Sequence, residues 1–239
     1  MEHGIRIADC GDSAVLVAAA GPGDDAWLVV HALADAVEAA GLSGVHGIVP
    51  AYDSLLVEFD CAATDHAAVR RAVADAARGL GGRPVPLPRT FTVPVVYGGE
   101  YGPDLPLVAD QLGLTEDEVI RRHTARHLTV RCLGAPAGAP MMDGPAFGRP
   151  VARLASPRTS VPAGSVAVAG RQAVICPVRS PGGWPLLGRT PLRVLDLDLD
   201  REPHTRYRPG DTFRFFPITP ADWPDHEGAL RPDQAAGRG

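Results

Sequence analysis

The chain has 239 residues, of which 45% are hydrophobic and 21% are charged, and its formal net charge is −5. This length suits one large or two small domains, and the composition suits a soluble globular protein. The sequence has no basic run, so nucleic acid and anionic membranes are poor candidate partners. Charged residues interrupt the N-terminal region and no apolar run reaches membrane-spanning length, so we expect neither a signal peptide nor a membrane span.

The four cysteines are far apart and form no C-x-x-C motif: they are Cys10, Cys61, Cys132 and Cys176. Each lies among apolar residues. This pattern is typical of reduced, buried thiols, and we expect a cytoplasmic protein.

The first 89 residues alternate between strand and helix patterns. We expect strands at 5–8, 13–18, 44–50 and 54–59, and amphipathic helices at 24–40 and 65–78. Two strand–helix–strand units in so short a segment predict a split βαβ, ferredoxin-like domain over residues 1–89.

The second segment begins with a strand at 90–97. Asp104 is expected to cap a short helix, and Thr115 with Glu118 forms the pattern of a capping box for a second helix. Further strands are expected at 128–133, 165–170, 172–178, 192–199 and 212–218, which is enough for a small closed β-barrel over 90–219. The predicted fold class is therefore α+β, and the polar residues 220–239 are typical of a disordered tail.

The most informative stretch is 156–191, where dense Pro and Gly clusters exclude a helix but flank a β-rich run. Arg158, Gln172 and Arg189 lie in or beside these clusters. Rigid loops limit the motion of an arginine, as a clamp for a carboxylate requires, although loop arginines are more often solvated. Glu100, beside a Gly-Pro turn, is a candidate site carboxylate.

His123 shares the inward helix face of Val119 and Ile120. It is either a satisfied core residue or a general acid or base with a pKa near neutrality. We expect no metal site. Asp196, Asp198 and Asp200 resemble the start of a calcium loop but lack its Gly and distant Glu, so a strand with one solvated face is favoured.

Three long motifs in order resemble one known family: 93–124, SPRTSVPAGSVAVAGRQ (156–172) and SPGGWPLLGRTP (180–191). The family is the B-type subunit of bacterial 5-oxoprolinase, also called allophanate hydrolase subunit 1 or carboxyltransferase subdomains C and D, and it includes an inhibitor of a sporulation kinase. The resemblance implies a ferredoxin-like domain followed by a cyclophilin-like β-barrel. It also implies a companion C-type subunit, a small-molecule substrate and ATP-dependent ring opening; in urea carboxylase the corresponding domains transfer a carboxyl group from biotin.

By matching motif positions, the resemblance assigns a site face to the following residues: Glu100, His123, Pro157, Arg158, Thr159, Gln172, Ser180, Gly182, Gly183, Arg189 and Thr190. Of these, His123, Arg158 and Gln172 are the candidate catalytic residues, and Glu100, Thr159 and Arg189 are candidate substrate-binding residues.

The sequence also departs from the family pattern. Two phenylalanine positions are Ala135 and Ala139, a Tyr-Leu pair is Met141 and Met142, and a further tyrosine position is Cys176. Losing these rings predicts an enlarged apolar pocket, with these five residues binding a bulky substrate. The alternative is repacking, in which other bulky residues fill the space.

These features leave three hypotheses open. The first choice is a divergent stand-alone enzyme, such as a cyclase or isomerase of specialised metabolism, that positions a bulky substrate. The alternatives are the B-type subunit of an ATP-dependent 5-oxoprolinase working with a C-type subunit, and a non-catalytic kinase-inhibitor-like binding protein. No cofactor is expected, and ATP enters only within an oxoprolinase complex.

Overall fold

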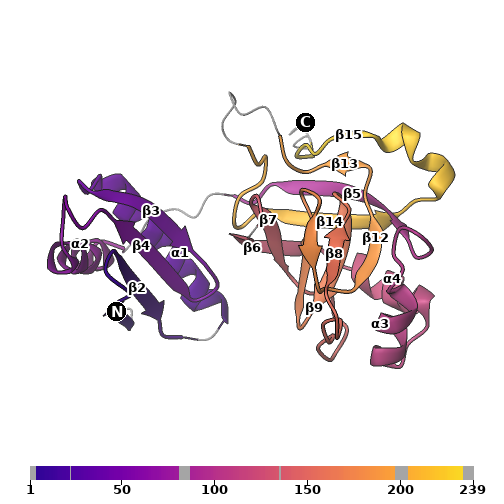
Figure 1. The fold of residues 1–239 in the computed structure, drawn as a ribbon, viewed down its shortest axis with the longest axis horizontal. Coiled ribbons are helices and arrows are strands. Elements are labelled where there is room, and N and C mark those ends of the chain that lie inside the picture. Colours follow the sequence, from indigo (N-terminus) through magenta and orange to yellow (C-terminus); the bar gives the residue numbers. More distant parts are fainter. Residues whose placement is uncertain (1–3, 22, 81–86, 135, 197–203, 234–239) are drawn as a thin grey trace, which may run out of the picture. The chain divides into compact units, whose positions relative to one another are not determined.

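The computed structural model describes residues 4–21, 23–80, 87–134, 136–196 and 204–233. It divides into two compact units, residues 1–87 (unit 1) and 88–239 (unit 2) (Figure 1). Within the described residues, no helix is both long and apolar enough to cross a membrane.

Unit 1 is a four-stranded antiparallel sheet packed against two helices. Its elements in chain order are β1 (Ile5–Asp9), β2 (Ala14–Ala19), α1 (Gly23–Ala40), β3 (Val45–Pro50), β4 (Ser54–Phe59) and α2 (His66–Arg78), and the strand order is β1-β2-β4-β3. Alternate residues of β2 and β4 are buried against apolar residues of the helices such as Leu33 and Val73. Asp65 caps α2 by accepting a hydrogen bond from the N–H of Ala68.

The topology of unit 1 contains one split strand–helix–strand unit, because β2 and β3 are joined through α1 and both pair with β4. The second expected unit, β4–α2, has no closing strand among the described residues of unit 1. The ferredoxin-like assignment therefore stays a prediction.

The expectation of buried thiols is wrong for two of the four cysteines. Cys10 and Cys61 are exposed, because they fall in the turns that follow β1 and β4 rather than within the strands. Cys132 and Cys176 are partly buried, and the structure describes all four as free.

Unit 2 is built on a closed seven-stranded barrel in the order β10-β7-β6-β14-β5-β12-β9. The barrel strands are β5 (Thr90–Tyr97), β6 (Leu128–Gly134), β7 (Ala139–Asp143), β9 (Ser165–Ala169), β10 (Gln172–Ile175), β12 (Leu186–Arg189) and β14 (Thr212–Pro217). A short pair, β8 (Arg158–Val161) with β11 (Ser180–Gly182), lies outside the barrel order. The closed barrel fits the predicted cyclophilin-like fold.

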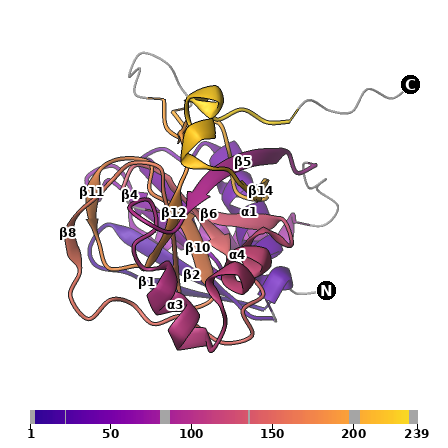
Figure 2. The same ribbon diagram turned by 90° about the vertical axis from the view of Figure 1, so that its right-hand side faces the viewer.

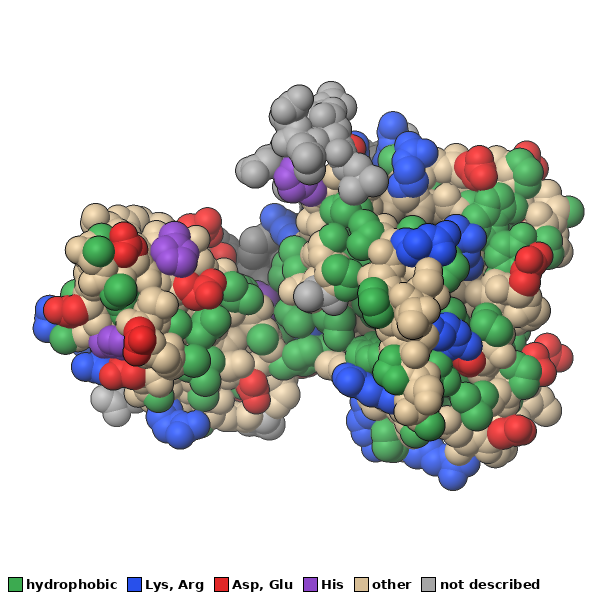
Figure 3. All heavy atoms as spheres, in the orientation of Figure 1, with side chains coloured by type: hydrophobic (Ala, Val, Ile, Leu, Met, Phe, Trp, Pro, Cys, Tyr) green, Lys and Arg blue, Asp and Glu red, His purple; other side chains and the backbone are tan. Residues whose placement is uncertain are grey.

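Alternate barrel residues point inward and form one core with the two helices that follow β5. These helices are α3 (Leu105–Leu112) and α4 (Glu116–Thr124). Phe91, Val93 and Phe213 from the strands join Val108 and Val119 from the helices in this core. Figure 2 shows α3 and α4 side by side at one end of unit 2 and the C-terminal turns at the other. Figure 3 shows hydrophobic, basic and acidic side chains together on one face of unit 2.

Two expectations about α3 and α4 need correction. Thr115 does cap α4, but Glu118 does not complete a capping box, since its carboxylate instead accepts hydrogen bonds from Arg121 and Arg122. These contacts hold the pKa of Glu118 at about 2, below its ordinary value. Asp104 makes no side-chain capping bond to α3.

The segment 220–233 is ordered, in contrast to the disordered tail that its composition predicts. It forms two 3₁₀ turns, η1 (Pro220–Asp222) and η2 (Pro224–His226), and then β15 (Gly228–Ala229), which pairs with β13 (Leu192–Arg193). Leu230 is buried in the barrel core, and Asp233 accepts hydrogen bonds from Thr92. One apolar anchor and one carboxylate thus fix a segment that is otherwise polar.

Candidate functional site

The turn that contains Glu100 is bonded to strand β12. The N–H of Gly98 donates to the carbonyl of Leu187 at 3.0 Å, and that of Asp104 donates to Leu186 at 3.2 Å. Gly102 lies so close to this strand that an added Cβ would stand 2.0 Å from the Leu187 oxygen, so no larger residue fits. This contact brings Glu100 beside the strand that carries Arg189.

Arg158, at the start of β8, is held by a bidentate ion pair with Asp104. Its Nη1 and Nη2 donate to the two carboxylate oxygens at 2.8 and 2.7 Å. Asp104 is only 6% exposed and also accepts the N–H of Leu186 at 2.8 Å. The carboxylate predicted to cap a helix thus fixes the guanidinium and the strand, in a fork geometry that is strong and directional.

A pocket of about 250 Å³ brings together three of the predicted site residues, Glu100, Arg158 and Arg189. Tyr101 and two serines, Ser160 and Ser165, also line it. The Nε of Arg189 donates to the carbonyl of Ala163 at 2.8 Å, and within the described residues Arg189 makes no ion pair. The pocket therefore offers one guanidinium without a counter-ion, hydroxyl groups and one carboxylate.

A second hollow of about 550 Å³ adjoins this pocket and shares Tyr101 and Arg189 with it. Trp223, from the C-terminal turns, lines the second hollow. The Arg189 guanidinium carbon lies 5.4 Å from the centre of the Trp223 ring, and the ring of Tyr101 lies 5.2 Å from that of Trp223. Arg189 is thus held by a cation–π contact and a backbone bond from two separate elements.

His123 does not line any of the described pockets. It is fully buried between Tyr97, whose hydroxyl lies 2.8 Å from its Nδ1, and Phe215, whose ring centre lies 4.6 Å away. Its Nε2 has no partner within the described residues, and burial lowers its pKa to about 3. The histidine is therefore neutral at ordinary pH and sealed in the core, and its acid–base role stays a prediction without support from the geometry.

Gln172 lines a different pocket, of about 400 Å³, which shares no residue with the pocket of Arg158 and Arg189. Its pocket is lined by Arg126, Arg149 and Arg171 together with apolar residues. The structure therefore separates the three candidate catalytic residues into three environments.

The residues that replace the family's aromatic rings do not line any of the described pockets. Ala139, Met141 and Cys176 lie together in a cluster with Val161 and Trp184. Met142 is fully buried in the barrel core. Burial raises the pKa of the Cys176 thiol to about 11. This packing corresponds to the repacking alternative. Ala135 lies outside the described residues.

Thr159 is exposed on β8 and is not among the pocket-lining residues. Among the described residues, no group of three His, Cys, Asp or Glu side chains is placed to hold a metal ion. Asp198 and Asp200 lie outside the described ranges.

Sequence reasoning missed several residues of the site. Tyr101, Ser160 and Ser165 line the pocket, Trp223 lines the second hollow, and Asp104 is the partner of Arg158. The only sequence signal for Trp223 was the presence of a tryptophan in an otherwise mostly polar C-terminal segment.

Residues 5–205 match the family described as "Carboxyltransferase domain, subdomain C and D". The chain belongs to this family. It is 35% identical over 205 residues to the B-type subunit of 5-oxoprolinase from Bacillus subtilis, covering 82% of this chain and 85% of that protein. The match to the corresponding 5-oxoprolinase subunit of Escherichia coli O157:H7 is 42% identical over 132 residues, covering 55% of this chain and 60% of that protein.

Solved structures show the same architecture. A structure of TTHA0988 matches with a TM-score of 0.71 and 34% identity, covering 86% of this chain but 40% of that protein. The protein PH0987 from Pyrococcus horikoshii matches at 34% identity with a TM-score of 0.53, covering 91% and 100%. The urea amidolyase of K. lactis, at 18% identity, has a TM-score of 0.79 over 97% of this chain and 16% of that chain, which supports the fold alone.

Proposed function

We propose that this chain is the B-type subunit of an ATP-dependent 5-oxoprolinase and works with a companion C-type subunit. The observation that carries this proposal is the 35% identity that spans 85% of the Bacillus subtilis relative. Neither the described pockets nor the relatives favour the cyclase or isomerase hypothesis, because Ala139, Met141 and Cys176 are packed rather than open.

The pocket around Arg189 suits the proposed substrate. 5-Oxoproline is a small lactam that bears one carboxylate, one ring N–H and one ring carbonyl. The Nη groups of Arg189, which make no hydrogen bond among the described residues, match the carboxylate, and Glu100 in the same pocket can accept the ring N–H. Arg158, with its charge balanced by Asp104, can donate to the ring carbonyl without adding a second net charge.

In this proposal the chain holds and orients the lactam, and the companion machinery supplies the ATP-dependent step. Ring opening adds water across the lactam C–N bond and gives glutamate, while ATP is hydrolysed. In this arrangement Glu100 holds the ring N–H, His123 is buried elsewhere, and the carboxylate of Asp104 is engaged by Arg158. Fixing the substrate for attack is itself a large contribution to the rate.

The proposal can be tested by co-expressing the chain with the companion subunits of the Bacillus subtilis or Escherichia coli enzyme. Glutamate formation from 5-oxoproline and ATP is measured on the purified complex. We expect turnover that needs this chain, and a loss of at least about tenfold with Arg189→Gln, since a charged hydrogen bond to substrate is removed.

Arg214→Gln provides the matched control, because Arg214 is exposed on β14 and bonds only to the Thr92 hydroxyl among the described residues. Failure to form a complex or to turn over 5-oxoproline with either companion would contradict the proposal. Equal activity of the Arg189→Gln and Arg214→Gln complexes would refute the assigned site.

A further inference from the structure

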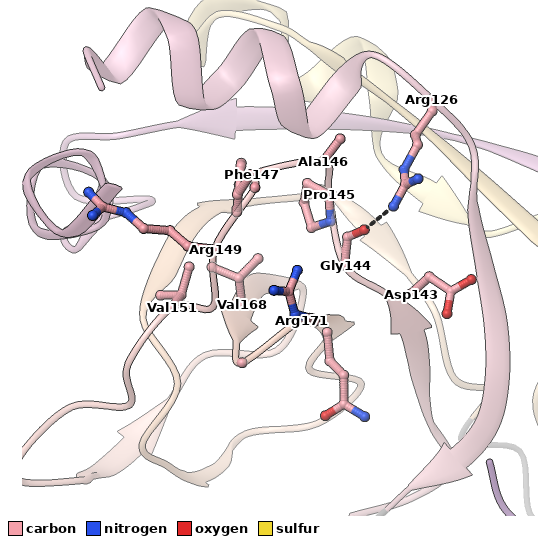
Figure 4. Close-up of a pocket in the computed structure, with 13 residues that line it drawn as sticks. Arg126, Asp143, Gly144, Pro145, Ala146, Phe147, Arg149, Val151, Val168 and Arg171 are labelled. Atoms are coloured by element: carbon pink, nitrogen blue, oxygen red, sulfur yellow. Dashed lines mark hydrogen bonds between the residues drawn. The ribbon is translucent and has the colours of Figure 1, made fainter. Parts of the chain in front are cut away.

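The arginine pocket, lined by Arg126, Arg149, Arg171 and Gln172, shares no residue with the two hollows around Arg189. Its volume is about 400 Å³. The three arginines come from three separate segments: the α4–β6 connection, the loop after β7 and the tight β9–β10 turn. In Figure 4 the Arg171 guanidinium stands in the middle of the pocket and Arg126 lies on one side of it, whereas the Arg149 side chain extends to the other side with its guanidinium pointing outward, close to Gly113.

The positive charge of this pocket is not neutralised by the described residues. Asp143 is the one carboxylate that lines the pocket, and it accepts hydrogen bonds of 2.7 to 3.0 Å from Nε and Nη2 of Arg131. Arg149 and Arg171 make no ion pair within the described part of the chain. Positive charges close to one another repel, and a bound anion offsets this unfavourable Coulomb energy.

Gly144 fixes two of the arginine-bearing segments. Its N–H donates to the Arg171 carbonyl at 2.7 Å, and its own carbonyl accepts Nη2 of Arg126 at 2.6 Å. An added Cβ at this position would stand 2.4 Å from the Arg171 carbonyl carbon, so only glycine allows this approach. The Arg126 guanidinium and the backbone of Arg171 are therefore both held against Gly144 before any ligand arrives, which lowers the entropic cost of binding.

Part of the pocket lining is apolar, buried and held by backbone hydrogen bonds. Phe147, Val151 and Val168 are each less than a tenth exposed, and Val151 exchanges two backbone hydrogen bonds with Gly170 at 2.9 and 2.7 Å. The pocket thus combines the guanidinium groups of Arg126 and Arg171 with a buried apolar surface. A ligand that carries both a strong anion and an organic portion matches both parts.

We propose that the arginine pocket binds a small molecule through a phosphoryl group. A carboxylate is satisfied by one guanidinium fork, whereas a phosphoryl group carries up to two negative charges and three acceptor oxygens that can face several donors. Arg171 supplies a guanidinium that makes no ion pair among the described residues, Arg126 supplies the N–H groups that the Gly144 carbonyl does not engage, and the amide of Gln172 supplies a further donor. The proposal goes beyond the function proposed above, because no residue of the 5-oxoproline pocket takes part.

Isothermal titration calorimetry of the purified chain tests this proposal, with inorganic phosphate and pyrophosphate as probes and acetate as the monoanion comparison. We expect pyrophosphate to bind more tightly than phosphate, and acetate to bind least. Arg171→Gln and Arg126→Gln should each weaken pyrophosphate binding at least about tenfold, because each loses a charge-assisted contact. Arg214→Gln should bind as the unchanged chain does.

Thermal unfolding of each variant checks that it is folded, and because both arginines are exposed, either variant alone can carry the test. Binding of neither phosphate nor pyrophosphate at millimolar concentration would overturn the proposal. Acetate binding as tight as that of pyrophosphate would overturn the phosphoryl assignment. Pyrophosphate binding that is lost in Arg189→Gln but kept in Arg171→Gln would place the anion in the other pocket and would also overturn it.

Discussion

The ion pair between Asp104 and Arg158 is expected to stabilise unit 2 as well as shape the candidate site. Replacing Asp104 by Ala removes two charged hydrogen bonds to Arg158 and one from the Leu186 N–H. Breaking a buried ion pair costs about 3 to 5 kcal/mol. The Arg158 side chain is 31% exposed, so water can solvate it in the variant, and we discount the cost to about 2 to 3 kcal/mol.

The assay is urea or thermal unfolding in a Trp27→Phe background, so that the fluorescence comes from Trp184 and Trp223, which both belong to unit 2. For a unit of this size a loss of about 2 to 3 kcal/mol lowers Tm by roughly 6 to 9 °C. Asp104→Asn should lose less, since its amide oxygen can still accept the Leu186 N–H.

A double-mutant cycle with Arg158→Ala separates pairing from other roles of Asp104. We expect a coupling energy of at least about 1 kcal/mol between the two positions. If Asp104 were only a helix cap, as its place before α3 suggests, the two changes would add independently. A coupling energy near zero, or an Asp104→Ala variant as stable as the unchanged chain, would refute the reasoning.

Three further predictions concern Trp223, His123 and Cys176. Trp223→Ala should raise KM for 5-oxoproline about two- to fivefold through loss of the cation–π contact with Arg189, whereas Trp223→Phe should not; equal KM values for the two variants would contradict this. The pKa of His123 is lowered from 6.5 to about 3, so the unfolded chain binds its proton first and stability falls as pH drops through that window. Denaturant unfolding should show a loss of about 2 to 3 kcal/mol between about pH 6 and pH 4 that is absent in His123→Gln, and parallel pH profiles would count against it. Cys176, whose pKa is raised to about 11 by burial, should resist alkylation at about pH 8 while the exposed Cys10 and Cys61 react, as peptide mass spectrometry would show; equal labelling would contradict this.

The sequence indicates the family, the barrel and part of the site, because these rest on local patterns. The segment 156–190 has the order of glycines, prolines and arginines that is typical of the family. Two candidate arginines of this segment, Arg158 and Arg189, line one pocket with Glu100. The expected helix starting at 104 and the strand at 90–97 correspond to α3 and β5. Apolar periodicity and turn residues determine such elements with little help from distant contacts.

Other features depend on contacts between distant residues and could not be predicted. Asp104 precedes a helix and so resembles a cap, but Arg158, fifty-four positions later, competes for its carboxylate with a full charge. Strand β7 carries Ala and Met rather than β-branched residues, and only its pairing with β6 and β10 makes it a strand. The order of residues 220–233 depends on Leu230, a single apolar residue that finds a place in the barrel core.

The altered aromatic positions show why loss of large side chains does not by itself create a pocket. Ala139 and Cys176 are smaller than the rings of the family pattern, but β8 and the indole of Trp184 cover them. A protein interior is closely packed, and an apolar void costs free energy in proportion to its volume, so neighbouring groups move in wherever the backbone permits. The polar pocket around Arg189 stays open for the opposite reason. Its walls are backbone segments fixed by Gly102 and by the Asp104–Arg158 pair, and charged groups cannot collapse onto one another without losing their hydration. In this chain, therefore, fixed charge accompanies an open pocket, whereas the lost aromatic rings do not.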